Sequence, residues 1–425
     1  TSTNPNFIPS LSYPTIFDQN GNKLYSAVRL DVIVTEPFLG FQAGNKNEQA
    51  VANNIDALGA AGTLISDTAL FNALETLTGQ TTAVINTALD QMHPAQYSAV
   101  VELQNAVSSQ LVSLFHRRPT SACYCANPVR IWIEPYGNWD KQKHRRMQVG
   151  FNSRTQGIAL GFDGKVFDKL VLGIGAAWDY KHLSWSLGRG KASGEGWLAG
   201  VYCDYTTDHY YFGFSCLGGL NNFHSDRHIR FATVPNTNPD EVIPETASLT
   251  PINEHARSNF DTLNLIGQAS TAFMFGPSKC CFFPYLNADI FYSDTGSIRE
   301  KDAPGLNLSV DPVRSMTFRS EAGMGLQVQD SNYTETMCIS PQVLLGWAME
   351  APLFREKYKS RFEGQTIPFR VEGWDTTWQL FTVDFGLTFT YYCYSFAGAY
   401  HLELQPDNHS SLFTQRCNFR AGFTW

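Results

Sequence analysis

The sequence has no apolar run long enough to form a membrane-crossing helix. Such a helix needs about 18 to 20 consecutive, mostly apolar residues, and no stretch of the 425 residues reaches that length. Charge is also scarce: charged residues make up 16% of the chain, and the longest basic run is KHRR at residues 143–146. The sequence therefore excludes a transmembrane helix and gives no electrostatic surface for nucleic acid, so we expect no nucleic-acid partner.

Common enzyme and metal motifs are missing as well. The chain has neither G-x-S-x-G, the turn that carries a hydrolase serine, nor the zinc motif H-E-x-x-H. The nine cysteines are scattered, and Cys123/Cys125 and Cys280/Cys281 lack the second half of a zinc ligand set. We therefore expect no enzyme activity, no metal and no cofactor. Cys123 and Cys125 could be oxidised in a periplasm-like compartment, and the odd count leaves at least one cysteine free or joined to another chain.

What the sequence does have is typical of many strands joined by turns: 13% aromatic residues, 33 glycines and 20 prolines. Residues 1–43 contain short β-prone runs, among them LSYPTIF and DVIVTEPF, and read as the end of a larger β-rich domain. Residues 44–92 read as a helical linker of three short helices. The chain begins at Thr1 without Met or a signal peptide, which we interpret as a processed product or a fragment.

Residues 93–118 predict a single amphipathic helix. Pro94 suits its first turn, and positively charged Arg117 lies where it complements the helix dipole. One apolar stripe follows i+3 and i+4 spacing, through Val100, Leu103, Val107, Leu111 and Leu114. The other faces carry amides and hydroxyls that could not face lipid. Taken alone, the pattern favours a helix on the surface of a soluble domain, and the residues that follow it reverse that interpretation.

After residue 118 the hydrophobic period changes from 3.6 to 2 and stays there to the end of the chain. A soluble β-sandwich alternates in the same way, but three features favour a membrane barrel. The strands are about 10 to 18 residues long, against about 5 to 6 in soluble sheets. One face is rich in Phe, Trp, Tyr and Leu, and the other is small, glycine-rich and charged. The connections alternate between tight turns and longer loops, of which the link from Ser225 to Ser258 alone has over thirty residues.

The predicted fold is therefore all-β: a twelve-stranded antiparallel transmembrane β-barrel with the preceding helix through its lumen. Because the strand count is even, the first strand begins and the last strand ends on the same side of the barrel, the side with the tight turns. The predicted strands lie near residues 129–140, 153–166, 169–184, 193–206, 209–223, 259–275, 280–294, 314–329, 333–350, 374–389, 392–404 and 411–425. The predicted units are 1–43, 44–92, 93–118 and the barrel 119–425.

Several charged residues occupy the alternate strand positions whose side chains are predicted to point into the barrel. The main candidates are Glu134, Asp179, Arg319, Glu321, Asp384, Arg416 and Arg420. They could bind the helix through hydrogen bonds and ion pairs, or they could simply solvate a wet interior. Arg319 and Glu321 are the strongest candidates for helix contacts, because they share one strand face beside two glycines that let a helix approach.

The order of these segments resembles the C-terminal translocator of type V secretion autotransporters over about residues 44–425. The matching stretches are AGNKNEQAVANNIDALG, LDQMHPAQYSAVVELQNAVSSQLVSLFHRR, IWIEPYGNWDKQ with TQGIALGFDGKVFDKLVLGIGAAWDY, and SLFTQRCNFRAGFTW. The resemblance implies an outer-membrane translocator in a Gram-negative bacterium that anchors and exports an N-terminal passenger to the cell surface. It also implies that the helix stays in the lumen and the C-terminus faces the periplasm.

The resemblance further implies partners and signals. We expect contact with outer-membrane lipid and lipopolysaccharide, insertion by the β-barrel assembly machinery, and a monomer. The last strand resembles the insertion signal read by that machinery, through Phe419, Phe423 and Trp425.

Two further hypotheses stay open at this point. Some autotransporters release their passenger by asparagine cyclisation at an Asn-Asn pair in the pore, and Asn53-Asn54 is such a pair, though it precedes the pore helix by about forty residues. The alternative to a translocator is a porin-like channel or a surface receptor or adhesin barrel, with residues 1–92 as a plug or cap.

Overall fold

A computed structural model describes most of the chain. The described residues are 7–12, 16–17, 23–24, 29–34, 43–66, 68–77, 80–116, 129–144, 148–231, 251–276, 280–328, 337–374, 377–405 and 412–424; the first four ranges are described as backbone only.

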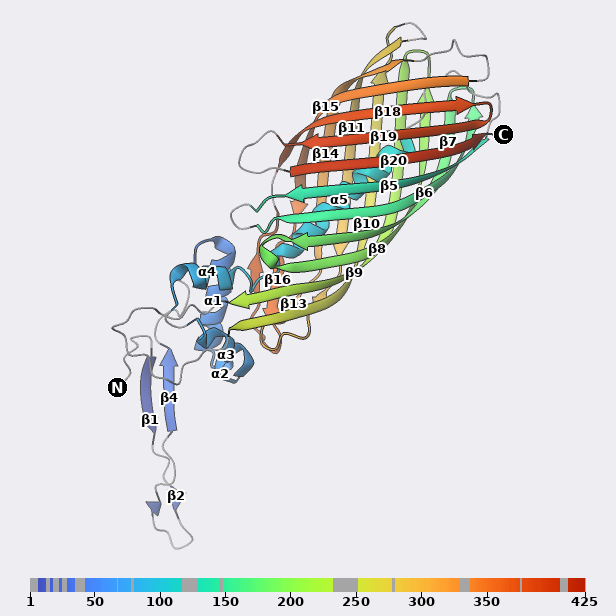
Figure 1. The fold of residues 1–425 in the computed structure, drawn as a ribbon. Coiled ribbons are helices and arrows are strands. Elements are labelled where there is room, and N and C mark those ends of the chain that lie inside the picture. Colours follow the sequence, from blue (N-terminus) through green and yellow to red (C-terminus); the bar gives the residue numbers. More distant parts are fainter. Residues whose placement is uncertain are drawn as a thin grey trace.

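Twelve strands form a closed barrel in which each strand pairs with its neighbour in sequence (Figure 1). All pairs are antiparallel, and β20 closes the barrel on β5, from Leu412 opposite Gln142 to Thr424 opposite Arg130. The barrel strands are β5 Val129–Gln142, β6 Phe151–Phe167, β7 Leu170–Trp185, β8 Gly190–Thr206, β9 Tyr210–Phe231, β10 Ile252–Phe273, β11 Cys280–Thr295, β14 Val313–Val328, β15 Met337–Arg355, β18 Trp378–Tyr391, β19 Tyr394–Leu404 and β20 Leu412–Thr424. The predicted twelve-stranded barrel is confirmed.

The two faces of the barrel wall differ as the alternation predicts. Successive side chains of a strand point to opposite faces, and large apolar residues lie exposed on the outward face, for example Leu160, Phe162, Ile174 and Leu220. The inward face carries buried polar and charged residues. Closure leaves no barrel strand with an unpaired edge, as a barrel in lipid requires.

The two ends of the barrel differ in their connections. At one end, here called the turn end, neighbouring strands are joined by tight turns such as Asp168-Lys169 and Tyr392-Cys393. At the other, the loop end, the connections are mostly longer. One link predicted to be long is shorter than expected: β9 and β10 each run 22 residues, which confines the link predicted at 225–258 to residues 232–251. The strands extend because their alternation continues beyond the apolar belt with polar outward residues.

The loop end also carries a second sheet that the sequence did not predict. It has the strand order β12-β13-β16-β17 and is formed by the β11–β14 and β15–β18 connections. The strands are short: β12 Ile298–Arg299, β13 Leu308–Val310, β16 Tyr358–Phe362 and β17 Phe369–Val371.

Four short helices lie at this end and pack with the second sheet (Figure 1). They are α1 Lys46–Ala60, α2 Thr63–Ser66, α3 Thr68–Glu75 and α4 Thr82–Leu89. Buried apolar residues of the helices and of the sheet belong to one cluster. We call residues 43–93, which contain helices α1–α4, the cap, and the second sheet the loop sheet.

A longer helix follows the cap and runs inside the barrel (Figure 1). Its first turn, η2 Pro94–Tyr97, is a 3-10 turn with Pro94 at its start, and α5 Ser98–His116 continues it. α5 contacts every strand from β5 to β11. Among the described residues, no helix is both long and apolar enough to cross a membrane.

The segment before the cap forms two antiparallel strand pairs. β1 Phe7–Ser12 pairs with β4 Arg29–Val34, and β2 Ile16–Phe17 pairs with β3 Lys23–Leu24. The β-prone character predicted for residues 1–43 is therefore present in the backbone.

Candidate functional site at the contact between helix and barrel

The predicted lumen-facing residues all lie on the inward face of the barrel. Each is at most 8% exposed: Glu134, Asp179, Arg319, Glu321, Asp384, Arg416 and Arg420. They come from strands distributed around the barrel, so the alternation alone brings them to one interior.

The helix is buried on all sides, rather than along one stripe. The predicted apolar stripe is buried throughout: Val100, Leu103, Val107, Leu111 and Leu114. The intervening polar residues are buried as well, namely Gln104, Asn105, Ser108, Ser109 and Gln110. Buried polar groups need hydrogen-bond partners, so the barrel wall must supply them. Arg117, predicted at the end of the helix, lies outside the described residues.

The amides of α5 bond to inward-facing groups on several strands. Gln104 donates to the Thr262 hydroxyl of β10, and its carbonyl oxygen accepts from Ser293 Oγ of β11 at 3.2 Å. Asn105 Nδ2 lies 3.3 Å from Thr317 Oγ1 of β14. These bonds satisfy helix side chains on more than one side of the bore.

Gln110 instead reaches the backbone of the strands at the barrel closure. Its Nε2 donates to the carbonyl oxygens of Gly137 in β5, at 3.1 Å, and Cys417 in β20, at 3.4 Å. The helix therefore spans the seam between the first and the last strand.

Three arginines of the barrel bind the helix directly. Arg355 pairs with Glu102 at 2.8 Å, and Arg416 Nη1 donates to Ser109 Oγ at 3.2 Å. Arg420 donates to the carbonyl oxygen of Leu114 and to Glu134. Leu114 is in the last turn of α5, where carbonyls lack intrahelical partners and a positive charge is favourable.

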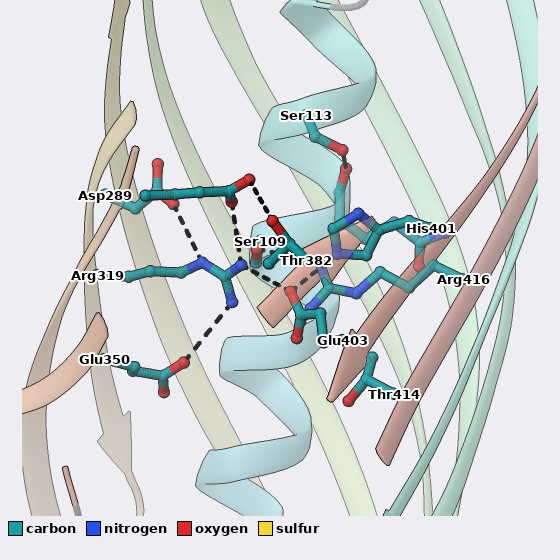
Figure 2. A network of polar contacts seen from close by, with 12 residues as sticks. Ser109, Ser113, Asp289, Arg319, Glu350, Thr382, His401, Glu403, Thr414 and Arg416 are labelled. Carbon is teal, nitrogen blue, oxygen red and sulfur yellow. Dashed lines mark hydrogen bonds and ion pairs between the residues drawn. The ribbon is translucent and has the colours of Figure 1, made fainter. Parts of the chain in front are cut away.

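Arg319 and Glu321 lie beside the helix, but their bonds differ from the prediction. Within the described part of the chain, their hydrogen bonds and ion pairs go to side chains of the barrel and of each other. Figure 2 shows Arg319 in front of α5, bonded to Glu403 at 2.6 Å and facing Asp289 and Glu350. Glu321 accepts from Tyr285, at 2.8 Å, and from Thr382, at 3.0 Å. Neighbouring carboxylates bind Arg319, so these two residues order the wall and leave helix binding to Arg355, Arg416 and Arg420.

The carboxylate of Glu403 connects this network to the helix contacts. It accepts from Arg319, from Arg416 at 3.2 Å and from His401 at 2.9 Å. His401 also pairs with Asp384, one of the predicted residues, at 2.8 Å. Glu403 therefore holds Arg416 in position to reach Ser109.

Aromatic side chains surround the turn-end tip of α5. Phe115 stacks on Tyr202 with ring centroids 5.5 Å apart, and tilts against Trp132 at 5.6 Å. An added Cβ at Gly175 would lie 2.5 Å from the Phe115 ring, so glycine is required for this approach. The guanidinium of Arg420 lies 4.5 Å from the Trp132 ring centre, within range for a cation–π contact.

The loop-end tip is held by residues that sequence reasoning missed. Trp185 Nε1 donates to the Gln96 carbonyl at 2.9 Å, and the Trp374 backbone N–H donates to Ser98 Oγ at 3.1 Å. The Tyr97 hydroxyl donates to Glu300 at 2.7 Å. Trp185 is the last residue of β7, and Trp374 and Glu300 lie in links between strands, so no periodic signal identified them.

The residues proposed as an insertion signal lie on the outward face of the last strand. Phe419 is 54% exposed and Phe423 is 40% exposed, while Trp425 lies outside the described residues. Cys123 and Cys125 also lie outside them.

Asn53 and Asn54 lie within the continuous helix α1 of the cap, not inside the barrel. Asn53 accepts from Gln49 at 2.8 Å, and Asn54 is buried and donates to the Ile367 carbonyl at 2.9 Å. This placement gives no support to cyclisation inside the pore.

Comparison with known proteins identifies a family whose model matches this chain. The model of the autotransporter beta-domain family matches residues 131–400. The translocator domain of the autotransporter NalP from Neisseria meningitidis has a TM-score of 0.53 at 10% identity, covering 77% of this chain and 97% of that chain.

Two further solved structures are more distant. The beta domain of the Bordetella autotransporter BrkA has a TM-score of 0.46 at 14% identity, covering 70% of this chain and 100% of that chain. The transport unit of the autotransporter AIDA-I from Escherichia coli has a TM-score of 0.42 at 10% identity, covering 76% and 98%. None of the curated proteins compared matches the sequence. The shared fold rests on the likeness to NalP.

A family match over well more than half of the chain coincides with a closed twelve-stranded barrel and a helix before it. The protein therefore belongs to the autotransporter beta-domain family, as an outer-membrane translocator of type V secretion in a Gram-negative bacterium.

Proposed function

We propose that this translocator carries an N-terminal passenger to the cell surface and retains α5 in the barrel lumen after export. The observation that carries the proposal is the set of polar contacts between α5 and the inward face of the barrel. Gln104, Ser109 and Gln110 are buried polar residues with partners on β10, β11, β20 and β5. A helix with this many amides would be costly in lipid and is satisfied by a polar bore.

In this proposal the loop end faces the outside of the cell and the turn end faces the periplasm. Short periplasmic turns and longer outer loops are typical of outer-membrane barrels. The C-terminus then lies in the periplasm, and the strands β1–β4 continue toward a passenger at the surface. The barrel acts as a monomer set in outer-membrane lipid and lipopolysaccharide.

The mechanism is physical rather than chemical. Burial of the outward apolar face in lipid stabilises the inserted barrel, and we expect Phe419, Phe423 and Trp425 to present the insertion signal to the assembly machinery. The charged wall offers hydrogen-bond partners to a chain in transit. Once α5 enters, Arg416 and Arg420 bind it and the bore closes.

Planar-bilayer conductance tests the position of the helix. The intact chain should conduct little, and deletion of residues 94–118 should open a stable pore. Heat-modifiable migration in a gel confirms that the deleted form still folds as a barrel. An unchanged conductance in a folded deletion variant would contradict the proposal, and a large conductance of the intact chain would favour a porin-like channel.

Surface display tests export. An epitope fused ahead of residue 1 should be accessible to antibody on intact cells. Arg416→Ala combined with Arg420→Ala should reduce the displayed fraction several-fold, while Lys191→Ala, on the outward face of β8, should not. If the double variant and Lys191→Ala displayed the epitope equally, export would not depend on the binding of the helix by Arg416 and Arg420.

A further inference from the structure

We propose that the cap is a latch: residues 43–93 dock on the outer loop sheet once they have left the barrel, and this docking keeps α5 from sliding back. The inference rests on the proposed function and adds a second barrier to it, one formed outside the bore. Its evidence lies in contacts that join the cap to the loops and to the first turn of the pore helix.

The cap buries its apolar side chains against other parts of the chain rather than around a separate core. Val51, Ile55 and Leu58 of α1 are fully buried. They belong to the same cluster as side chains of the loop sheet, namely Ile298, Leu308, Val310, Phe362, Phe369 and Val371. Neither partner could bury these groups alone, since four short helices and a small sheet each have one apolar side. Docking therefore releases hydrophobic free energy.

Helix α1 also pairs with the backbone of the sheet at its β17 end. The Asn47 side chain donates to the Glu372 carbonyl and accepts from the Glu372 N–H, both at 2.8 Å. Asn54 adds a bond to the Ile367 carbonyl. The Asn47 amide makes the same pair of backbone hydrogen bonds that a neighbouring strand would make. These bonds fix the position of the cap on the sheet.

A buried ion pair joins the cap, the loops and the pore helix. Arg227 on β9 bonds to Glu300 at 2.5 and 2.7 Å, and to the carbonyl oxygens of Gln91 and Leu306. The same Glu300 accepts from Tyr97, at the start of the helix. One guanidinium therefore binds the strand wall, the loop sheet and the junction between cap and helix.

These contacts can form only when residues 43–93 stand at the loop end, because every partner lies there. Docking thus adds binding free energy to the end state of export and to no earlier state. A ligand that binds one of two states shifts the equilibrium toward that state, and the cap acts as such a ligand attached to the chain. The result is a passage that proceeds in one direction.

Gly305 gives a sharp way to release the latch. It lies in the loop before β13 with φ +76°, and an added Cβ would lie 2.4 Å from the Leu70 backbone N of α3 and 2.6 Å from Ala69 C. Gly188, in the β7–β8 connection, has a similar φ of +69°, and an added Cβ there would have no heavy atom within 4 Å. Gly305→Ala and Gly188→Ala therefore introduce the same methyl group and similar backbone strain, but only the first obstructs docking.

The test uses the full chain in planar bilayers and in hydrogen exchange. With Gly305→Ala we expect the amides of α1 and α3 to exchange at least about tenfold faster, and brief channel openings to become at least about tenfold more frequent, the size expected of an overpacked contact. Gly188→Ala should change neither. Asn47→Ala removes two bonds to Glu372 without adding bulk, and should give a smaller change in the same direction.

Two results would overturn the latch. Unchanged exchange in Gly305→Ala would contradict the docking contact, and released helices without more frequent openings would show that docking does not hold α5. Both results differ from a failure of the proposed function, because deletion of residues 94–118 reports on the helix in the bore whether or not the cap is docked.

Discussion

The two ends of the pore helix are held in different ways. At the turn end, α5 meets barrel strands: Phe115 stacks on Tyr202, and Arg420 binds the Leu114 carbonyl. At the loop end, the helix meets connections between strands, through Glu300 and Trp374. The turn end is bound mostly by aromatic packing on the wall, and the loop end by a buried ion pair and the cap.

This difference shows which end can move independently. The turn-end contacts are fixed to strands that are paired on both sides, so releasing Phe115 requires the helix to move. The loop-end contacts of Glu300 and Trp374 depend on connections far apart in sequence that pack together at the end of the barrel. Regions with such contacts open locally more readily than paired strands. We therefore expect the helix to loosen first from the loop end.

Arg227→Ala should have the largest effect and should act on the loop end alone. It leaves the Glu300 carboxylate buried without its partner, and it removes donors from the Gln91 and Leu306 carbonyls. Breaking a buried pair in this way costs about 3–5 kcal/mol. Hydrogen exchange should become much faster in residues 43–97 and stay slow at residues 110–116.

Lys191→Ala is the control for Arg227→Ala, since Lys191 is a basic residue on the outward face of the neighbouring strand β8. It should leave both ends of α5 protected. Equal deprotection of the two ends by Arg227→Ala would mean that the helix is released as one unit.

Phe115→Ala should reverse the pattern and loosen the turn end. Loss of a buried aromatic side chain costs about 3 kcal/mol or somewhat more when the neighbours cannot close the space, and Tyr202 and Trp132 belong to a rigid wall. Exchange should become faster at residues 110–116, while the cap stays protected. Phe115→Leu keeps most of the apolar volume and should recover most of the protection. If Phe115→Leu were as damaging as Phe115→Ala, the ring contacts themselves would be decisive.

The sequence could predict which strand residues face the interior, but not which residues they contact there. Alternation fixes which face a strand residue takes, so Glu134, Arg416 and Arg420 could be assigned to the interior from period alone. The strand count and the antiparallel order followed from turn and loop lengths. The residues of the predicted helix stripe, from Val100 to Leu114, are all buried.

The partner of each inward residue could not be predicted. Whether Arg319 binds the helix or neighbouring carboxylates depends on distances across the barrel, which the period does not specify. The loop sheet was missed for a similar reason. β12, β13 and β17 have only two or three residues each, too few to show a period, and they pair only because distant loops meet.

Lowering the pH should release the cap before it affects the turn end. Burial would raise the pKa of Asp90, but the hydrogen bond with His93 and the charge of Arg189 outweigh it and lower the pKa to about 2. Because the folded-state pKa is depressed, the stabilisation is complete above the usual pKa near 4 and is lost as the pH falls toward 2. A pKa lowered from 3.8 to about 2 corresponds to about 2.5 kcal/mol of stabilisation.

Glu48, also in the cap, affects the stability of the docked cap in the opposite direction as the pH falls. Burial raises its pKa, and the charge of Asp90 adds to the increase, so its protonation favours the docked cap as the pH falls through its usual range. The cap should therefore remain docked at pH 5 and become open to protease between about pH 4 and 2. Asp90→Asn should abolish that acid transition. Release already at pH 6, with carboxylates still charged, would contradict the assignment to Asp90.

Ser109→Ala, in the middle of α5, should have the smallest effect and should leave both ends protected. The hydroxyl accepts one bond from Arg416, at 3.2 Å, and Arg416 keeps its bond to Glu403 after the change, so no charge is left without a partner. The loss should be about 1 kcal/mol, the usual net value of one hydrogen bond, measured as a shift in the urea midpoint of the folded barrel. Ser113→Ala is the matched control, because that hydroxyl donates to the Gln110 carbonyl of the same helix and its removal should not alter contact with the wall. A cost for Ser109→Ala as large as that of Phe115→Ala would mean that the helix is bound chiefly at its centre, and the contrast between its two ends would then lose its physical basis.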